Sequence, residues 1–303
     1  WNAARFCEMN ECNPVVGFDP ASAQEPVNRW IAAELKQAAA TVAQGIEAFK
    51  FDEAAGGIYR FVWNIFCDWY LEFAKPLLNG EDEAAKAETR AMAAYVLDQI
   101  LKVLHPVMPF LTEELWQQIG MRTGGRDQLL ILTRWPELSY ETDETARSEM
   151  DWVIRLVSEI RSVRSEMNVP AGAQVPLMIK DAAAATQQAA QKHAPLIERL
   201  ARVKDIKFTD ADVKGAIQTV VDEAGLFLPL AGIMDLDAER ARLEKEIDKL
   251  DGLVKRIDGK LANEKFTANA PAEVVEKERE KKDDLLRTRE KLADALTRLS
   301  SAA

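Results

Sequence analysis

The chain has 303 residues, of which 48% are hydrophobic and 29% are charged, and its formal net charge is −11. This length is enough for a sizeable core and favours two or three units over one. No apolar run reaches the roughly 20 residues of a membrane span and no charged-then-apolar leader occurs, so we expect a cytoplasmic protein without membrane segments. Three cysteines without C-x-x-C spacing and only two histidines argue against a disulfide framework and against a metal site.

The charges are distributed unevenly along the chain. Residues 235–303 hold 16 basic and 17 acidic residues, whereas residues 1–234 hold 23 basic and 33 acidic ones. An acidic body disfavours indiscriminate binding to phosphates, because carboxylates repel a nucleic-acid backbone. The tail is nearly neutral and dense in charge, so any basic surface there must arise from the arrangement of its residues.

The chain opens with WNAARF, without a methionine and already inside an apolar-periodic pattern, so we expect it to be a piece of a longer protein. Asn2, Arg5 and Phe6 are candidate RNA contacts, because an aromatic ring beside an arginine can stack on an unpaired base and hydrogen-bond to it. The alternative is a helix stub with a buried phenylalanine.

Helical periodicity continues to about residue 136. Apolar residues recur every three or four positions from Ile31 to Phe49 and again within 84–104, where Met92 and Val103 lie on one line. Short turns rich in proline, glycine and asparagine separate these helices, so neighbouring helices are expected to run antiparallel. The pattern predicts a helical bundle.

The segment FVWNIFCDWYLEFAKPLL, residues 61–78, is predicted to be a central helix that packs on most sides. Asp52 is suited to cap its start, and Pro76 is expected to end it. Gly56 and Gly57 lie outside any phosphate-binding glycine motif, so close helix contact is the expected role. One polar stripe interrupts the apolar surface: Arg60, Asn64, Asp68 and Glu72.

A further helix is predicted from about Thr145 to Met167. Beyond it, four β-like runs surround an Ala/Gln-rich helix that ends near Arg202. Together they predict a small α+β unit on one compact sheet, which shows no catalytic constellation and which we interpret as a junction. The runs are VPLMI, DIKFT, AIQTVV and GLFLPL.

The pattern changes from Asp235 onward. Apolar residues follow the spacing of a coiled-coil seam, FTANAP (266–271) interrupts them, and a second run follows, so we predict an antiparallel helical hairpin that projects as a stiff arm roughly 40 Å long. The first run is Leu243, Ile247, Leu250, Val254, Ile257 and Leu261, and the second is Leu285, Leu292, Leu296 and Leu299.

Five cations share one side of the first arm helix: Arg242, Lys245, Lys249, Arg256 and Lys260. Gly252 and Gly259 each cost a helix interior about 1 kcal/mol relative to alanine, and glycine lets another backbone approach closely. The hypothesis is that a nucleic-acid backbone lies along this side. The alternative is a solvated face with weak i,i+4 ion pairs.

Five strings resemble, in this order, the C-terminal part of bacterial valyl-tRNA synthetases, which are class I enzymes: WNAARF, NRWI, FDEAAGGIYRFVWNIFCDWYLEFAKPLL, LHPVMPFLTEELW and EIRSVRSEMNVP. The resemblance covers essentially the whole chain, and the helical hairpin separates the valine enzymes from their isoleucine relatives. It implies a mainly α fold in three parts: an anticodon-binding helical bundle (1–144), an α+β junction (145–234) and a coiled-coil tRNA-binding arm (235–303).

The resemblance also implies valine tRNA as the partner. Asn2, Arg5 and Phe6 would read the anticodon, and the five arm cations would brace the outer corner of the folded tRNA. The family binds ATP through H-x-G-H and K-M-S-K-S motifs, and neither occurs in this sequence. We therefore expect no catalytic residue, cofactor or metal in this chain and no aminoacylation by it alone, while ATP and Mg²⁺ belong to the parent enzyme.

Two other functions stay open. The first is a helical protein-interaction module that uses its coiled coil to bind a partner or a second copy of itself. If the seam is filled within one chain, the protein should be a monomer, as we expect, whereas a coiled coil between two chains predicts a dimer. A metal-dependent or hydrolytic enzyme would depend on His105 or His193, and no Ser/His/Asp or Cys/His set supports it.

Overall fold

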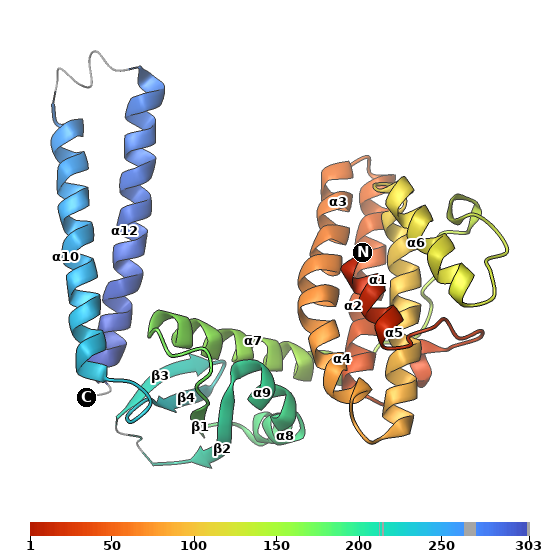
Figure 1. Cartoon of the computed structure of the whole chain (residues 1–303), viewed down its shortest axis with the longest axis horizontal. Helices are drawn as coiled ribbons and strands as arrows, with labels where there is room; N and C mark the ends of the chain where they lie inside the picture. The colour runs from red at the N-terminus through yellow and green to blue at the C-terminus, as the bar shows by residue number, and fades with distance from the viewer. Residues whose placement is uncertain (212, 214, 264–270, 302–303) are drawn as a thin grey trace. The chain divides into compact units, whose positions relative to one another are not determined.

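The structure, a computed structural model, describes residues 1–211, 213, 215–263 and 271–301. The chain forms two compact units, Trp1–Ile154 and Arg155–Ala303 (Figure 1). The boundary between the units falls within one long helix, α7 (Glu144–Glu166). The finer division into a bundle, a junction and an arm stays a prediction.

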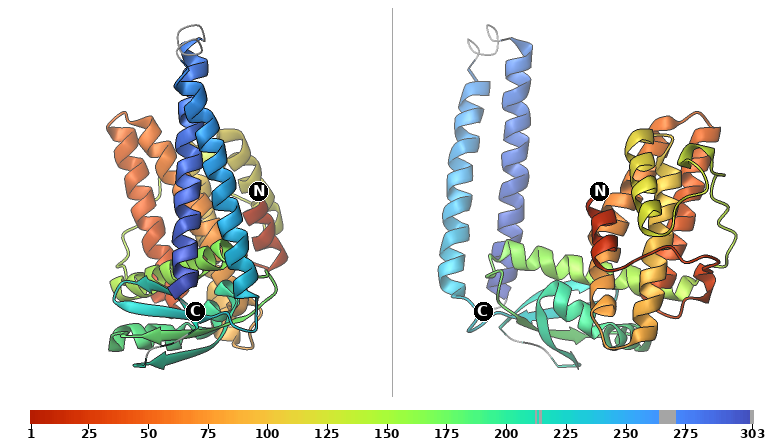
Figure 2. Two further views of the ribbon diagram at one scale, coloured as in Figure 1. Left: turned by 90° about the vertical axis from the view of Figure 1, so that its left-hand side faces the viewer. Right: turned by 45° about the vertical axis from the view of Figure 1, so that its right-hand side comes forward.

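The first unit is a bundle of helices, as the sequence predicts. Its long helix α2 packs against α3 and α5, and α5 also contacts α1, α4 and α6 (Figures 1 and 2). The elements in chain order are α1 (Asn2–Met9), η1 (Pro20–Ser22), α2 (Pro26–Glu47), α3 (Phe51–Arg60), η2 (Phe61–Tyr70), α4 (Leu71–Leu78), α5 (Glu83–Leu104), α6 (Pro109–Arg122) and η3 (Leu130–Leu132).

The predicted central helix is the run α3–η2–α4, in which η2 has the wider π-helical turn. Phe61, Phe66 and Phe73 are fully buried, and Phe73 meets Trp30 of α2 edge-on with ring centroids 5.8 Å apart. The run therefore belongs to the core. Its polar stripe faces outward, because Arg60, Asn64 and Asp68 are exposed and Glu72 is half-buried.

Three local predictions in this region are wrong. Asp52 lies in the first turn of α3, behind Lys50 at the N-cap. Pro76 lies inside α4, which continues to Leu78 because the backbone N–H of Asn79 still donates to the carbonyl of the residue before Pro76 (3.0 Å). Phe49 lies beyond the end of α2 with a φ of +57°, so its side chain is 79% exposed instead of sharing the apolar face.

Glycines bring α2 and α3 into close contact. A Cβ on Gly45 would lie 2.9 Å from the Cβ of Ala54, and a Cβ on Gly57 would lie 3.2 Å from Cγ2 of Thr41. The packing role predicted for Gly57 is confirmed. A Cβ on Gly56 would instead meet the guanidinium of Arg60 at 3.2 Å.

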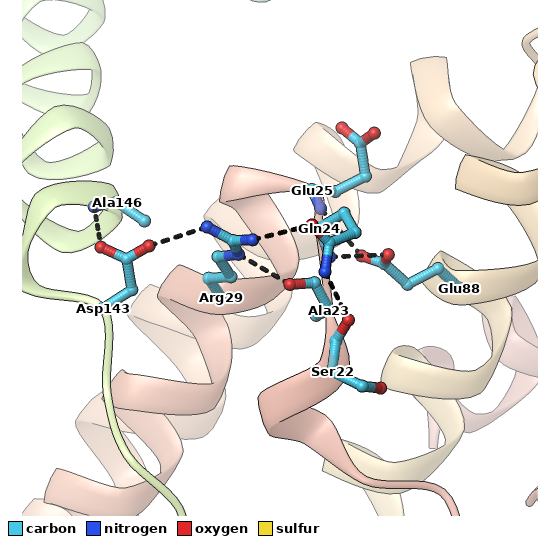
Figure 3. Close-up of polar contacts among 8 residues, drawn as sticks. All are labelled: Ser22, Ala23, Gln24, Glu25, Arg29, Glu88, Asp143 and Ala146. Atoms are coloured by element: carbon cyan, nitrogen blue, oxygen red, sulfur yellow. Dashed lines mark hydrogen bonds and ion pairs between the residues drawn. The ribbon is translucent and has the colours of Figure 1, made fainter.

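A carboxylate of α5 fixes the start of α2. Glu88 accepts hydrogen bonds from the backbone N–H groups of Gln24 (2.8 Å) and Glu25 (3.0 Å) (Figure 3). It also accepts one from the side-chain amide of Asn28 (2.9 Å). Free N–H groups at a helix start need acceptors, and a negative charge is favourable there. Glu88 supplies both the acceptor oxygens and the negative charge, and it links the start of α2 to α5.

The start of α7 is joined to the same corner of the bundle. Arg29 donates to Asp143 (3.0 Å), and Asp143 accepts a hydrogen bond from the backbone N–H of Ala146 (3.0 Å) (Figure 3). The N–H of Ala146 and the guanidinium of Arg29 together hold the pKa of Asp143 below its ordinary value. Asp143 is thus an N-cap residue whose charge is stabilised.

The second unit contains the predicted single sheet. The strand order is β2-β1-β4-β3, with β1 and β2 parallel and the other neighbours antiparallel. The Ala/Gln-rich helix is in fact two helices, since Pro195 lies in the first turn of the second one. The elements are β1 (Val175–Lys180), α8 (Ala184–Lys192), α9 (Ala194–Ala201), β2 (Val203–Thr209), β3 (Ala216–Val221), β4 (Ala224–Pro229), α10 (Leu236–Leu261) and α12 (Ala272–Ser301).

Helices α10 and α12 lie side by side as the predicted hairpin (Figures 1 and 2). Asp235 caps α10 by accepting from the N–H of Ala238 (3.0 Å), and 26 residues give α10 a length of about 39 Å. Residues 266–270 of the predicted break lie outside the described residues. Four residues of the predicted seam are buried: Leu243, Val254 and Ile257 of α10, and Leu299 of α12. Val275 and Ala295 of α12 are buried in addition, and the other predicted seam residues are half-buried: Ile247, Leu250, Leu261, Leu285, Leu292 and Leu296.

Candidate nucleic-acid interface

The three residues predicted to read RNA lie on helix α1. Asn2 and Arg5 are exposed, and their side chains have no hydrogen-bond or ion-pair partner among the described residues. Phe6 is half-buried, so the alternative of a buried phenylalanine is only partly met. Positions i, i+3 and i+4 of a helix share one side, so α1 brings these side chains together.

A hollow of about 410 Å³ lies between α1 and α6. Arg5 lines it together with Trp1 and Glu8, whereas Asn2 and Phe6 do not. Glu8 also approaches Arg122 of α6, with the carboxylate and guanidinium 3.6 Å apart. Of the three predicted residues, Arg5 is therefore the one placed beside a cavity.

The five arm cations fall into two groups. Arg242 is already engaged, because it binds Glu239 and lies 3.0 Å from Glu246, and these carboxylates raise the pKa of its guanidinium. Lys260 pairs with Glu278 of α12 at 2.9 Å. The remaining cations are exposed and form no ion pair within the described part of the chain: Lys245, Lys249 and Arg256.

The side of α10 that carries these cations contains no acidic residue. Successive helical residues are rotated by about 100°, and an arc of about 100° holds only small and basic side chains. At Gly252 and Gly259 an added Cβ would meet no atom within 4 Å, so packing inside the arm does not require glycine there. The residues of this basic face are Ala238, Ala241, Arg242, Lys245, Lys249, Gly252, Arg256, Gly259 and Lys260.

The sequence analysis did not predict that three charged residues of α12 lie in the seam: Glu278, Lys282 and Arg289. Arg289 donates to Asp251 (2.7 Å), and this bond lowers the pKa of Asp251. Lys282 lies 2.6 Å from Asp258 in the same way. The signal was available, because the heptad spacing of α12 passes through charged positions: Val275, Glu278, Lys282, Leu285, Arg289 and Leu292.

The described residues offer little else for chemistry. They contain no group of three His, Cys, Asp or Glu side chains that could hold a metal ion, and the three cysteines are free thiols. No helix in the described part of the chain is long and apolar enough to cross a membrane. His105 contacts the Thr112 hydroxyl within its own helical hairpin (2.7 Å).

Two families of known domains match the chain. Residues 28–179 match the family described as the anticodon-binding domain of tRNA ligase. Residues 235–300 match the valyl tRNA synthetase tRNA binding arm. The first match begins within α2, so α1 and η1 lie outside it, and it extends through the rest of the bundle into β1. The second match coincides with the α10–α12 hairpin.

Curated relatives agree with both matches. Valine–tRNA ligase of Brucella suis is 50% identical over 303 residues, which cover 100% of this chain and 33% of that protein. The corresponding proteins of Rhizobium meliloti and Caulobacter vibrioides are 51% and 48% identical over 302 residues, covering 100% and 99% of this chain and 32% and 33% of theirs. The chain thus spans about a third of the length of these relatives, and it belongs to the valyl-tRNA synthetase family, in which it corresponds to the anticodon-binding domain and the tRNA binding arm.

Proposed function

We propose that this chain is the tRNA-binding C-terminal part of a valine–tRNA ligase and that its partner is valine tRNA. ATP-dependent aminoacylation then belongs to the part of the protein outside this chain, since the relatives are about three times as long. The cytoplasm is the expected location. The closed seam between α10 and α12 supports a monomer, because its apolar and charged positions find partners within one chain.

In this proposal the bundle reads the anticodon. Support comes from α1, where the exposed Asn2 and Arg5 side chains have unused hydrogen-bonding groups among the described residues and Phe6 offers a partly exposed ring. Single-stranded RNA loops are recognised through such combinations, because an unstacked base can lie on an aromatic or guanidinium plane while its edge forms hydrogen bonds.

The arm then holds the outer corner of the same tRNA. The observation that carries this assignment is the basic face of α10, which combines three cations without an ion pair among the described residues with glycines and alanines and contains no carboxylate. A phosphate backbone attracts such a face, and small residues permit close approach. Arg242 and Lys260 also belong to this face, but they bind carboxylates of the arm and so contribute less free charge.

A charge-reversal experiment tests the arm. Replacing Lys249 and Arg256 by glutamate should weaken binding to valine tRNA and reduce the slope of log affinity against log salt by about one unit per lost phosphate contact. Lys255→Glu with Lys291→Glu is the matched control, because it changes charge equally at exposed arm positions outside the basic face. An unchanged slope in the first variant would remove the face as a phosphate contact.

A selectivity experiment tests the bundle. The unaltered chain should bind valine tRNA more tightly than a tRNA with another anticodon, and Arg5→Ala should reduce that preference without changing the salt slope, since base contacts carry specificity and phosphate contacts carry salt dependence. Equal binding of both tRNAs by the unaltered chain would refute the assignment of anticodon reading to the bundle.

A further inference from the structure

A second and larger cavity of the first unit, about 710 Å³, lies between α5, α6 and the segment that follows α6. Tyr95, Gln99 and Lys102 line it from α5, and their i, i+4, i+7 spacing places them on one side of that helix. Arg134 and Trp135 contribute from the irregular segment after η3. We refer to this cavity as the α5–α6 cleft, and its size is within the range of small-ligand sites.

Gln99 is the unusual residue of the α5–α6 cleft. It is only 9% exposed, yet its amide forms no hydrogen bond with any described residue. The Asn28 amide and the Tyr70 hydroxyl are paired by contrast: the Asn28 amide binds Thr89 (3.1 Å), and the Tyr70 hydroxyl donates to Asn28 (3.0 Å). The ring nitrogens Trp30 Nε1 and His105 Nε2 are buried and also lack a partner among the described residues, but neither residue lines the cleft. The amide atoms of Gln99 are not among the buried atoms that lack a partner, so they are open to the cleft, where Gln99 offers an NH2 donor group and one acceptor to a ligand.

Planar groups line the same cleft as this amide. The guanidinium of Arg126 lies 3.7 Å from the centroid of the Trp116 ring and donates to both carboxylate oxygens of Asp98 (3.0 and 2.8 Å). Arg126 is thereby fixed as a flat surface in the lining of the cleft. Trp135 is 38% exposed and supplies an indole ring. Guanidinium planes and aromatic rings are the surfaces on which unpaired bases stack.

The charges that line the cleft sum to nearly zero, so a phosphate is not favoured as its main ligand. Lys102 and Arg134 are balanced by Asp127 and Glu137, which also line the cleft, while Arg126 is neutralised by its own carboxylate partner. Burial lowers the pKa of Lys102, in keeping with a partly dehydrated site. The lining therefore suits a flat, uncharged ligand with a hydrogen-bonding edge.

We propose that the α5–α6 cleft binds one unpaired nucleobase of the tRNA, stacked on the Trp135 and Arg126 planes and read along its edge by the amide of Gln99. This inference rests on the proposed tRNA-binding function and adds a specificity-determining residue that is separate from α1. A glutamine amide can form two hydrogen bonds to a base edge, which discriminates between bases.

The test uses the whole chain with Gln99→Leu and Trp135→Ala. Leucine has a similar volume and removes an unpartnered amide, so Gln99→Leu should fold with undiminished thermal stability. The Gln99→Leu variant should bind valine tRNA about tenfold more weakly, which corresponds to about 1.4 kcal/mol, while the slope of log affinity against log salt stays unchanged. One tRNA base that the unaltered chain protects from chemical modification should become reactive in the presence of the variant. Gln44→Leu, on the exposed side of α2, is the control.

The outcomes separate this inference from the proposed function. If the unaltered chain binds valine tRNA while both cleft variants bind it equally well and protect the same bases, the cleft proposal is overturned and the proposed function stands. If the unaltered chain ignores tRNA at low salt, the proposed function fails, and titration with AMP, GMP, CMP and UMP decides the cleft. Binding of one nucleotide that Gln99→Leu abolishes supports the cleft, and binding of none overturns it.

Discussion

Replacing Gly252 and Gly259 by alanine should stabilise the arm and weaken its hold on RNA. Both glycines lie inside α10, where an added Cβ meets no atom within 4 Å, so the change introduces no clash. Alanine is favoured over glycine by about 1 kcal/mol per helix-interior position, which gives about 2 kcal/mol for the pair. The two methyl groups, however, lie on the basic face and keep an RNA backbone further away.

Hydrogen exchange of the α10 amides measures the first effect, because local opening reports the stability of one element independently of the rest of the chain. A gain of about 2 kcal/mol corresponds to roughly 30-fold slower exchange. Binding to valine tRNA measures the second effect. Losing one close contact, worth about 1 kcal/mol, should weaken binding about fivefold.

The two measurements together identify why glycine occurs on this side of the arm. Slower exchange with unchanged tRNA affinity would refute the idea that the glycines allow close approach of RNA. Gly172→Ala is the control, since Gly172 also has open space around its Cβ position but lies outside the arm. It should leave tRNA affinity unchanged.

Three further predictions concern stability. Gly45→Ala should cost about 1–3 kcal/mol in thermal unfolding, because its Cβ would lie 2.9 Å from a Cβ of α3; a neutral result would mean that α2 and α3 separate easily. Asp143→Asn should lower the free energy of unfolding measured in urea at pH 7. The backbone N–H of Ala146 and the guanidinium of Arg29 lower the pKa of Asp143 in the folded chain, so the fold stabilises the charged form. The difference from the unaltered chain should therefore shrink as the pH falls below the ordinary aspartate pKa of about 3.9. A deficit independent of pH would contradict this. Glu278→Leu should stabilise α12 by about 1 kcal/mol, seen as slower hydrogen exchange of its amides, because one carboxylate oxygen of Glu278 is buried without a hydrogen-bond partner among the described residues. Faster exchange would show that the ion pair of Glu278 with Lys260 contributes more to stability than the buried oxygen costs.

The long helices and the hairpin seam follow from the sequence because one pattern repeats over several turns in each. Residues 84–104 and 145–167 were predicted to within one residue of α5 and α7, since each presents an apolar line to one side. Helical spacing also predicted that the five arm cations share one side of α10. The carboxylates that bind Arg242 lie three and four residues away on its own helix, whereas the pair of Lys260 with Glu278 depends on where α12 lies, which spacing could not show.

Features set by individual backbone hydrogen bonds or by tertiary contacts could not be predicted from hydrophobic spacing. The π-helical turn of residues 61–70, the helical position of Pro76 and the left-handed backbone of Phe49 each depend on local hydrogen bonds that hydrophobic spacing does not encode. The α5–α6 cleft forms only when the segment after α6 folds back over α5. Gln99 therefore resembles any other polar residue of a long helix until its missing partner becomes visible.

The charged seam of the arm also determines how its two helices are aligned lengthwise. Asp251 faces Arg289, Asp258 faces Lys282, and Lys260 faces Glu278. Sliding α12 by one heptad would keep one attraction in one direction, Asp258 against Arg289, and two in the other, Asp251 against Lys282 and Glu244 against Arg289. Both slips lose the pair of Lys260 with Glu278, whereas a purely leucine seam would tolerate the slip. Ionic pairing thus gives the hairpin one preferred alignment, and with it a fixed reach for the cations displayed on α10.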